Sequence, residues 1–306
     1  MRKIVFSLIA AAAFALSGFA QEASAPYALP FVSITRDGAQ AAMGGAGSSM
    51  GGAFSALRNP AAAALSGVTA LEAGYQSWSP DNIPSTNINA GGSILLGSGL
   101  ALELAFATQS GEAYDIMSDG GVTGDSFTPS DMLIGAGLGY MINEALSLGA
   151  SFKIASQKLS PDDSYSAFAL DLSALYRTGD VRVGGGVSNL LGSVKASSGD
   201  SFSLPASVFV AADWSKSLQG GSVSVALDAD YFLKGGFAAA LGAQYGIKDI
   251  AFLRAGYHLG SGDAPVGSYA SVGAGLRFKG FGLDAAYLLG DEAIGGGLLA
   301  SLSYRF

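Results

Sequence analysis

The last eleven residues, GGLLASLSYRF (296–306), alternate between two kinds of side chain. Successive side chains of a strand point to opposite faces, so this pattern predicts a strand with one apolar and one mostly polar face. A soluble β-sandwich also alternates, and the alternation alone does not say what covers the apolar face. The apolar set is Leu298, Ala300, Leu302, Tyr304 and Phe306, and the other set is Leu299, Ser301, Ser303 and Arg305.

The same alternation recurs in about fourteen segments of roughly ten residues, the length of a tilted membrane strand. Tight connections such as 143–144 alternate with longer ones such as 110–129, as in outer-membrane barrels. Aromatic residues near strand ends are typical of interface girdles: Trp78, Trp214, Tyr231, Tyr257, Tyr287 and Tyr304. The predicted strands are 68–78, 87–96, 99–109, 130–142, 145–157, 165–177, 180–190, 204–215, 221–233, 236–246, 249–260, 267–279, 280–289 and 296–306.

Composition favours a membrane environment over water. Hydrophobic residues make up 49% of the chain and charged residues only 13%, against about 25% charged in soluble domains. No segment after the N-terminus is a run of ~18 apolar residues, so spanning helices are not expected. The sequence therefore predicts an all-β fold: a transmembrane antiparallel up-and-down β-barrel of about 14 strands.

The first residues have the pattern of a secretory signal peptide. Arg2 and Lys3 precede a short apolar run, and small residues allow cleavage after Ala20 or, alternatively, after Ala25. The absence of cysteine excludes disulfides, thiol catalysis and a lipid-modified cysteine. The predicted organisation is a signal peptide (1–20), an N-terminal extension with a hatch (21–67) and the barrel (68–306).

The charged side chains of the predicted strands share the phase opposite to the apolar face. Lys or Arg facing lipid at the bilayer centre would cost ~2–4 kcal/mol, so this shared phase points into the lumen. Seven glycines also face inward, at 135, 137, 139, 184, 186, 273 and 275; they either admit a plug or relieve strand curvature. The predicted lumen-facing polar residues are Glu72, Glu103, Lys153, Asp171, Arg182, Asp228, Arg254, His258, Arg277 and Arg305, with Asp213, Asp230 and Asp284 in the same phase.

The segment MGGAGSSMGGAFSALRNPAAAAL (43–65) has the small residues of a phosphate-binding loop, but it contains no lysine to bind the phosphates. It does not fit the dinucleotide fingerprint either, because Met50 stands at the third glycine position. Helix-prone pieces at 39–42, 53–57 and 61–65 precede the first strand. They predict a helical hatch that folds into the barrel, with Asn59 hydrogen-bonded to the backbone.

Two motifs in this region resemble a known family. Residues 36–46 (RDGAQAAMGGA) look like the "ARAAAMGGA" opening of the PorV/PorQ outer-membrane proteins, which are related to FadL-type transporters. Residues 59–61 (NPA) are similar to that superfamily's hatch signature, and 187–192 (VSNLLG) resemble its "vqNLG" motif. The resemblance implies a hatch motif of Met43, Gly44, Gly45, Asn59, Pro60 and Ala61. It also implies the outer membrane of a Gram-negative, Bacteroidetes-like bacterium, with lipid and lipopolysaccharide around the barrel.

No catalytic or cofactor site is expected. His258 is the only histidine, and Ser261 and Asp263 lie at the same strand end, which is poor geometry for a triad. The net charge of −8 disfavours nucleic-acid binding. Acidic residues in the long loops form either a solvated rim or Ca²⁺ ligands, the rim being favoured.

Two functions remain open. Resemblance to PorV and PorQ implies a non-catalytic barrel that helps a type IX-like system deliver or attach surface proteins, with secretion-system proteins or secreted cargo as partners. The alternative is a FadL-like channel for a small hydrophobic ligand. The two differ in the lumen: an apolar tunnel, for which Phe209 and Phe232 have the inward phase and Phe168 does not, favours transport. A blocked, charged interior favours the partner role.

Overall fold

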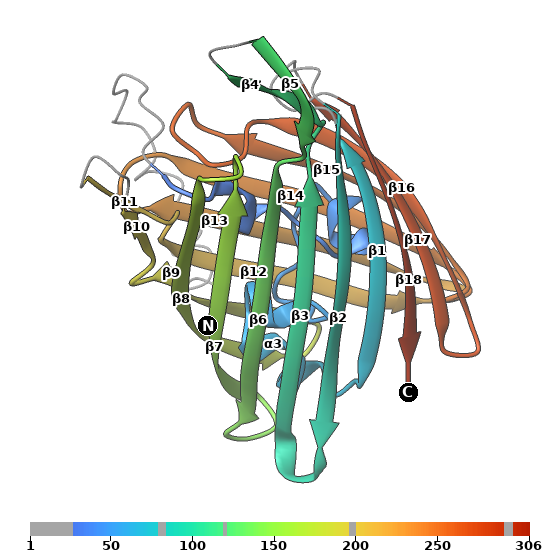
Figure 1. The fold of residues 1–306 in the computed structure, drawn as a ribbon. Helices are drawn as coiled ribbons and strands as arrows, with labels where there is room; N and C mark the ends of the chain where they lie inside the picture. Colours follow the sequence, from blue (N-terminus) through green and yellow to red (C-terminus); the bar gives the residue numbers. More distant parts are fainter. Residues whose placement is uncertain (1–26, 79–83, 119–120, 196–199, 291–295) are drawn as a thin grey trace.

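The computed structural model describes residues 27–78, 84–118, 121–195, 200–290 and 296–306. Fourteen antiparallel strands close into one barrel (Figure 1), in which each strand pairs with its neighbours in the chain and β1 closes on β18. The barrel strands are β1 (Ala70–Trp78), β2 (Ser85–Leu96), β3 (Leu100–Ser110), β6 (Ser130–Met141), β7 (Leu146–Lys158), β8 (Ser164–Thr178), β9 (Val181–Leu190), β12 (Ser207–Leu218), β13 (Gly221–Phe232), β14 (Phe237–Ile247), β15 (Ala251–Gly260), β16 (Tyr269–Phe278), β17 (Phe281–Gly290) and β18 (Gly296–Arg305).

The fold class predicted from the alternation is confirmed, and the predicted strands match the observed ones within about three residues. The structure adds two hairpins that the sequence analysis placed in loops: β4 (Tyr114–Ser118) with β5 (Gly121–Phe127), and β10 (Ser193–Lys195) with β11 (Ser201–Ser203). Both pair only within themselves, outside the barrel sheet. The strands of the second hairpin have three residues each, too few to carry a readable alternation.

The two faces of the wall follow the predicted phase. On β18, Leu298 and Leu302 are exposed on the outside, whereas Leu299 and Ser301 are buried inside. Large apolar side chains are exposed along nearly every barrel strand, for example Leu104 on β3 and Leu253 on β15. Such a continuous apolar outer surface is stable in lipid and not in water. Among the described residues, none of the helices has the length and hydropathy needed to cross a membrane.

The two ends of the barrel differ. One end carries short turns, such as 219–220 and 279–280, together with the start of β1 and the end of β18; we call it the short-turn end. The other end, the long-loop end, carries the two small hairpins and the 261–268 connection (Figure 1).

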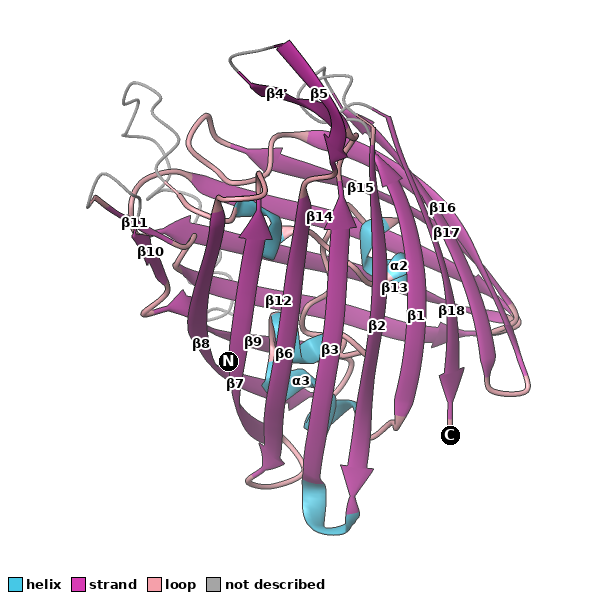
Figure 2. Cartoon of the chain, viewed as in Figure 1, coloured by secondary structure: helices cyan, strands magenta, loops and turns pink. Residues whose placement is uncertain are grey.

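Residues 27–67 form the hatch and lie within the barrel (Figure 2). They contain η1 (Pro30–Ser33), α2 (Gly38–Ala41), η2 (Ser55–Leu57) and α3 (Pro60–Ser66). The hatch starts at the long-loop end, where the Tyr27 hydroxyl donates to the Gly235 carbonyl. It ends at the short-turn end with α3, which has Pro60 in its first turn and Gly67 at its C-cap with φ 68°.

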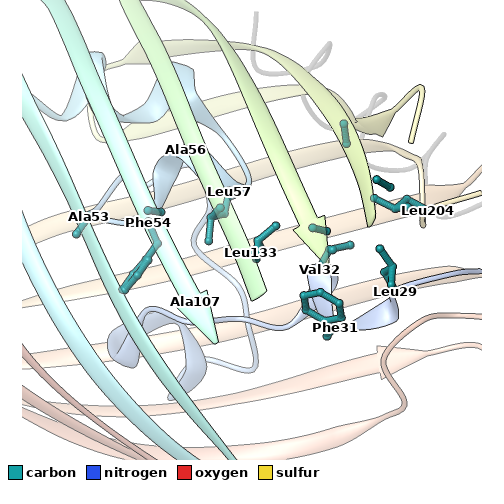
Figure 3. Packing of buried hydrophobic residues seen from close by; sticks show 14 of the residues in the cluster. Leu29, Phe31, Val32, Ala53, Phe54, Ala56, Leu57, Ala107, Leu133 and Leu204 are labelled. Carbon is teal, nitrogen blue, oxygen red and sulfur yellow. The ribbon is translucent and has the colours of Figure 1, made fainter. Parts of the chain in front are cut away.

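An apolar cluster joins the hatch to the wall (Figure 3). Phe54 and Leu57 of the hatch pack with Ala107 and Leu133 of β3 and β6, and all four are buried. The inward glycines divide between the two roles left open by the sequence. Those at 135, 137 and 139 face hatch atoms of residues 56–64, whereas those at 184 and 186 face atoms of the barrel sheet itself.

Trp78 differs from its predicted place in an interface girdle. It lines a small cavity inside the barrel, and its indole nitrogen is buried. Trp78 has the inward phase of Gly74 and Gln76, so its position near the strand end misled the prediction.

Candidate functional site: the hatch and the cavities on its two sides

The hatch contains only three charged residues, Arg36, Asp37 and Arg58. Arg58 binds Asp230 of β13 with two hydrogen bonds of 2.8 and 2.6 Å and lies over the Phe209 ring. Burial opposes the charge of Arg58, but the Asp230 carboxylate outweighs it and raises the pKa of Arg58. This bidentate pair holds the middle of the hatch to the wall.

Two further carboxylates of the wall bind the hatch. Asp228 accepts hydrogen bonds from the backbone nitrogens of Gly47 and Ser48, at 3.2 and 3.1 Å. Asp213 accepts one from the Ser49 hydroxyl at 2.7 Å and is also paired with Arg182 at 2.9 Å. Sequence analysis placed these carboxylates inside but could not identify their partners.

The Met43-Gly44-Gly45 part of the predicted hatch motif lies against β14 and β15. The Gly44 nitrogen donates to the Ser271 hydroxyl at 2.7 Å, and Gly44 has φ +71°. A Cβ atom on Gly44 would lie 2.6 Å from the backbone nitrogen of Tyr257, so hatch and wall meet backbone to backbone here.

The Asn59-Pro60-Ala61 part of the motif is buried among strands β6 to β8. The Asn59 amide donates to the Ser48 carbonyl at 3.1 Å, which confirms the predicted bond to the backbone. Ala61 donates to the Ser173 hydroxyl at 3.1 Å and accepts from the Ser147 hydroxyl at 2.8 Å. The motif therefore fixes both the hatch interior and the start of α3.

All ten predicted lumen-facing residues lie on the inner face. Lys153 pairs with Asp171 at 2.7 Å, and both are fully buried. Arg254 and Arg277 share Asp284, at 2.7 and 2.6 Å. The remaining placements are as follows: Glu72 accepts from the Gly38 nitrogen, Glu103 is buried without a hydrogen-bond partner among the described residues, His258 stacks on Tyr269, and Arg305 lines a cavity at the short-turn end.

Two cavities lie on opposite sides of α2. The first, which we call the chamber, has a volume of about 90 Å³ and extends toward the long-loop end, where Phe232 and Val266 line it. The second, the vestibule, has a volume of about 790 Å³ and lies at the short-turn end, where Lys279 and Arg305 line it. Asp37 and Gln40 line both cavities. The helix α2 is therefore the partition between them.

Asp37 also stabilises this partition. Its carboxylate accepts from the Gln40 nitrogen at 2.9 Å and so caps α2. Burial raises the pKa of Asp37. The adjacent Arg36 donates to the carbonyls of Ile34 and Phe31, at 2.6 and 2.8 Å, and burial lowers its pKa to about 10, so it remains charged at neutral pH. The sequence pattern did not predict these roles of Arg36 and Asp37, although two adjacent charges in a nearly uncharged segment were a signal for them.

The chamber is lined by both apolar and charged groups. Phe54, Leu57 and Phe232 supply apolar surface, and Phe209 and Phe232 are buried inside the barrel whereas Phe168 is exposed outside. Three carboxylates line the chamber, on Asp37, Asp228 and Asp230, against the two guanidinium groups of Arg36 and Arg58. Within the described part of the chain, no three His, Asp or Glu side chains cluster as a metal site would require.

No protein-family model matches the sequence, and no curated protein matches it. Solved structures do match over most of their length. The toluene transporter TodX of Pseudomonas putida aligns with a TM-score of 0.57 and 13% identity, covering 89% of this chain and 98% of that chain. The Ralstonia pickettii toluene transporter TbuX aligns with a TM-score of 0.57 and 14% identity, covering 88% of this chain and 97% of that chain. A Pseudomonas aeruginosa FadL homologue aligns with a TM-score of 0.52 and 14% identity, covering 89% of this chain and 98% of that chain. At these identities the likeness is one of fold.

Proposed function

We propose that the protein is an outer-membrane channel that admits small, largely apolar molecules. A molecule enters the chamber from outside, rests against the hatch, and passes to the vestibule when α2 moves. The observation that carries this proposal is the shared wall: Asp37 and Gln40 line both cavities, so displacement of one helical turn would join them. The similarity in fold to the toluene transporters TbuX and TodX supports it.

The PorV/PorQ resemblance supports a different role in type IX-like secretion. That role rests on short motifs, whereas two cavities separated by a single turn favour passage of a small molecule. We therefore place the alternative function, the FadL-like channel, first. Partners among secreted proteins remain a prediction from the motifs.

Orientation is part of the proposal. Long loops face outside and short turns face the periplasm in outer-membrane barrels. A cysteine at Glu112, near the long-loop end, is expected to react with an impermeant thiol reagent on intact cells, and one at Asn143 is not. The reverse pattern would invert the direction of transport.

Uptake by a Gram-negative host tests the function. Cells that produce the barrel are expected to accumulate radiolabelled toluene or benzyl alcohol, at micromolar external concentration, faster than cells with an empty vector. The variant Val266→Trp fills the chamber mouth and should abolish the gain, because Val266 lines the chamber. Leu259→Trp adds the same ring on the lipid-facing side of the neighbouring strand and should leave uptake intact.

One outcome would contradict the proposal, and a second measurement would then decide in favour of the secretion role. If the barrel is present in the membrane and uptake equals that of cells with the empty vector, the protein does not transport these molecules and the proposal is wrong. If secreted proteins then co-purify with the barrel after mild detergent extraction, that result supports the role in secretion.

A further inference from the structure

A third cavity of about 20 Å³ lies beside the chamber, between the hatch and strands β1, β15, β16 and β17. We call it the side cavity. Ser33, Ile34, Thr35, His258 and Val266 line both the side cavity and the chamber. The two spaces are therefore neighbours separated by few atoms.

The walls of the side cavity carry polar atoms that have no hydrogen-bond partner in the described part of the chain. The Gln76 amide oxygen and the Trp78 indole nitrogen are buried without a hydrogen-bond partner among the described residues, and only 1% of the Gln76 surface is exposed. The ring nitrogens of His258 likewise make no well-formed hydrogen bond, although the carbonyls of Gly44 and Val266 lie near them. A buried polar group left unpaired is costly, so such groups mark a place for water or a ligand atom.

These atoms are complementary to one oxygen that both accepts and donates. The Trp78 N–H is a donor only, and the Gln76 amide oxygen is an acceptor only. A volume of about 20 Å³ suffices for a group the size of one water molecule. A hydroxyl group satisfies both partners at once, whereas a methyl group satisfies neither.

Charge argues against an anionic head group. Of the residues that the structure describes, no lysine or arginine lines the side cavity. In the chamber three carboxylates face two guanidinium groups; Arg58 is paired with Asp230, and Arg36 donates to two carbonyls and keeps a buried Nε without a partner among the described residues. The lining therefore carries more negative than positive charge, which favours an uncharged group over an anion.

We propose that the chamber and the side cavity together form a site for a small uncharged alcohol or phenol. Its apolar body lies in the chamber on Phe54 and Phe232, and its hydroxyl enters the side cavity between Gln76 and Trp78. This inference rests on the proposed function and names the class of molecule that the channel selects.

The two tryptophans of the chain provide the measurement. Trp214 is exposed on the outer face, and Trp78 lines the side cavity. The variant Trp214→Phe therefore leaves a single fluorescent reporter at the site. Purified protein is titrated with benzyl alcohol, toluene, benzoate and benzylamine. We expect benzyl alcohol to change the Trp78 emission with an affinity about tenfold higher than toluene, the factor of one net hydrogen bond.

Gln76→Leu tests the recognising group. It should remove the tenfold preference while leaving toluene binding intact. Gln109→Leu is the matched control, because the Gln109 amide oxygen also has no partner within the described structure but Gln109 does not line the side cavity. The preference of this variant for benzyl alcohol should equal that of the parent. Trp78→Phe, measured by calorimetry, should reduce benzyl alcohol binding as Gln76→Leu does.

The outcomes separate this inference from the transport proposal. Equal affinities for toluene and benzyl alcohol, unchanged by Gln76→Leu, would overturn the inference and indicate that only water occupies the side cavity. This result would not contradict the transport proposal. If benzoate or benzylamine binds more tightly than benzyl alcohol, the ligand of the site is not an uncharged molecule and the inference is wrong. Binding of none of the four, together with no uptake, would overturn both proposals.

Discussion

Two sides of the lumen treat buried polar groups differently. The paired wall, strands β7–β9, β12, β13 and β15–β17, holds the ion pairs of Asp171, Asp213, Asp230 and Asp284. Its buried polar atoms without a partner in the described structure are confined to Asn189 and His258. The unpaired wall, strands β18 and β1–β3, buries polar atoms without a protein partner among the described residues. They belong to Gln76, Trp78, Asn87, Asn89, Ser93, Glu103, Gln109, Ser301 and Ser303.

The difference shows how the hatch is held. Charge-assisted bonds from Asp228 and Asp230 fix the hatch to the paired wall. On the unpaired wall the hatch makes apolar contacts, such as Phe54 with Ala105 and Ala107, and one polar contact from Gly38 to Glu72. We therefore expect substitutions of buried polar residues to be costly on the paired side and mild on the other.

The largest effect is expected at Asp171. Asp171→Asn leaves the buried Lys153 charge unpaired, which costs about 3–5 kcal/mol of unfolding free energy. Glu103→Gln is the matched change on the unpaired wall and should lower that free energy by less than about 1 kcal/mol, because Glu103 has no partner to lose among the residues that the structure describes. Urea unfolding in detergent micelles measures both. Similar losses at the two sites would remove the distinction between the walls.

The next effect concerns hatch closure. Arg58→Met and Asp230→Asn each break the pair that holds the hatch to β13. In planar bilayers the parent should show little steady ion conductance, and either variant should show frequent open events. The double variant should be no more open than either single one, because both remove the same interaction. An additive effect would mean that the two residues act separately.

A smaller effect is expected from two buried asparagines. Both are fully buried, but the Asn59 amide donates to the Ser48 carbonyl, whereas the Asn89 side chain has no partner in the described structure. Asn59→Leu should loosen the hatch by about 1–3 kcal/mol, since it leaves that carbonyl unpaired. Asn89→Leu should be neutral or stabilising. Limited proteolysis of the hatch reports the difference, and equal sensitivity would indicate that ordered water satisfies Asn89.

The smallest effect depends on pH. Because the pKa of Asp37 is raised in the folded state, its contribution to stability is complete below the unfolded value and is lost as pH rises through the folded value. Asp37→Asn keeps a capping oxygen and removes the charge. The variant should therefore melt higher than the parent at pH 8, and the gap should close toward pH 4. A gap that widens on acidification would show that the charged form is favoured.

The barrel could be predicted from the sequence pattern, because placing a polar side chain in lipid is costly and the outward positions of the strands are therefore mostly apolar. It also placed the hatch, through the loss of alternation before residue 68. The partners in the ion pairs could not be predicted from the sequence. Arg58 and Asp230 are 172 residues apart, and only strand register and the path of the hatch bring them together. The partition at Asp37 and the side cavity at Gln76 depend on the same three-dimensional path.

The path of the hatch also restricts how the barrel is built. The Ala28 nitrogen donates to the Ser203 carbonyl at one end of the lumen, while Phe306 donates to the Thr69 carbonyl at the other, beside the β1–β18 contact that closes the ring. If the ring closed first, some forty residues would have to thread through a finished cylinder, past backbone contacts as close as that between Gly44 and Tyr257. We therefore expect the open sheet to curl around the hatch before the first strand joins the last, so that the hatch serves as an internal template for the cylinder that later encloses it.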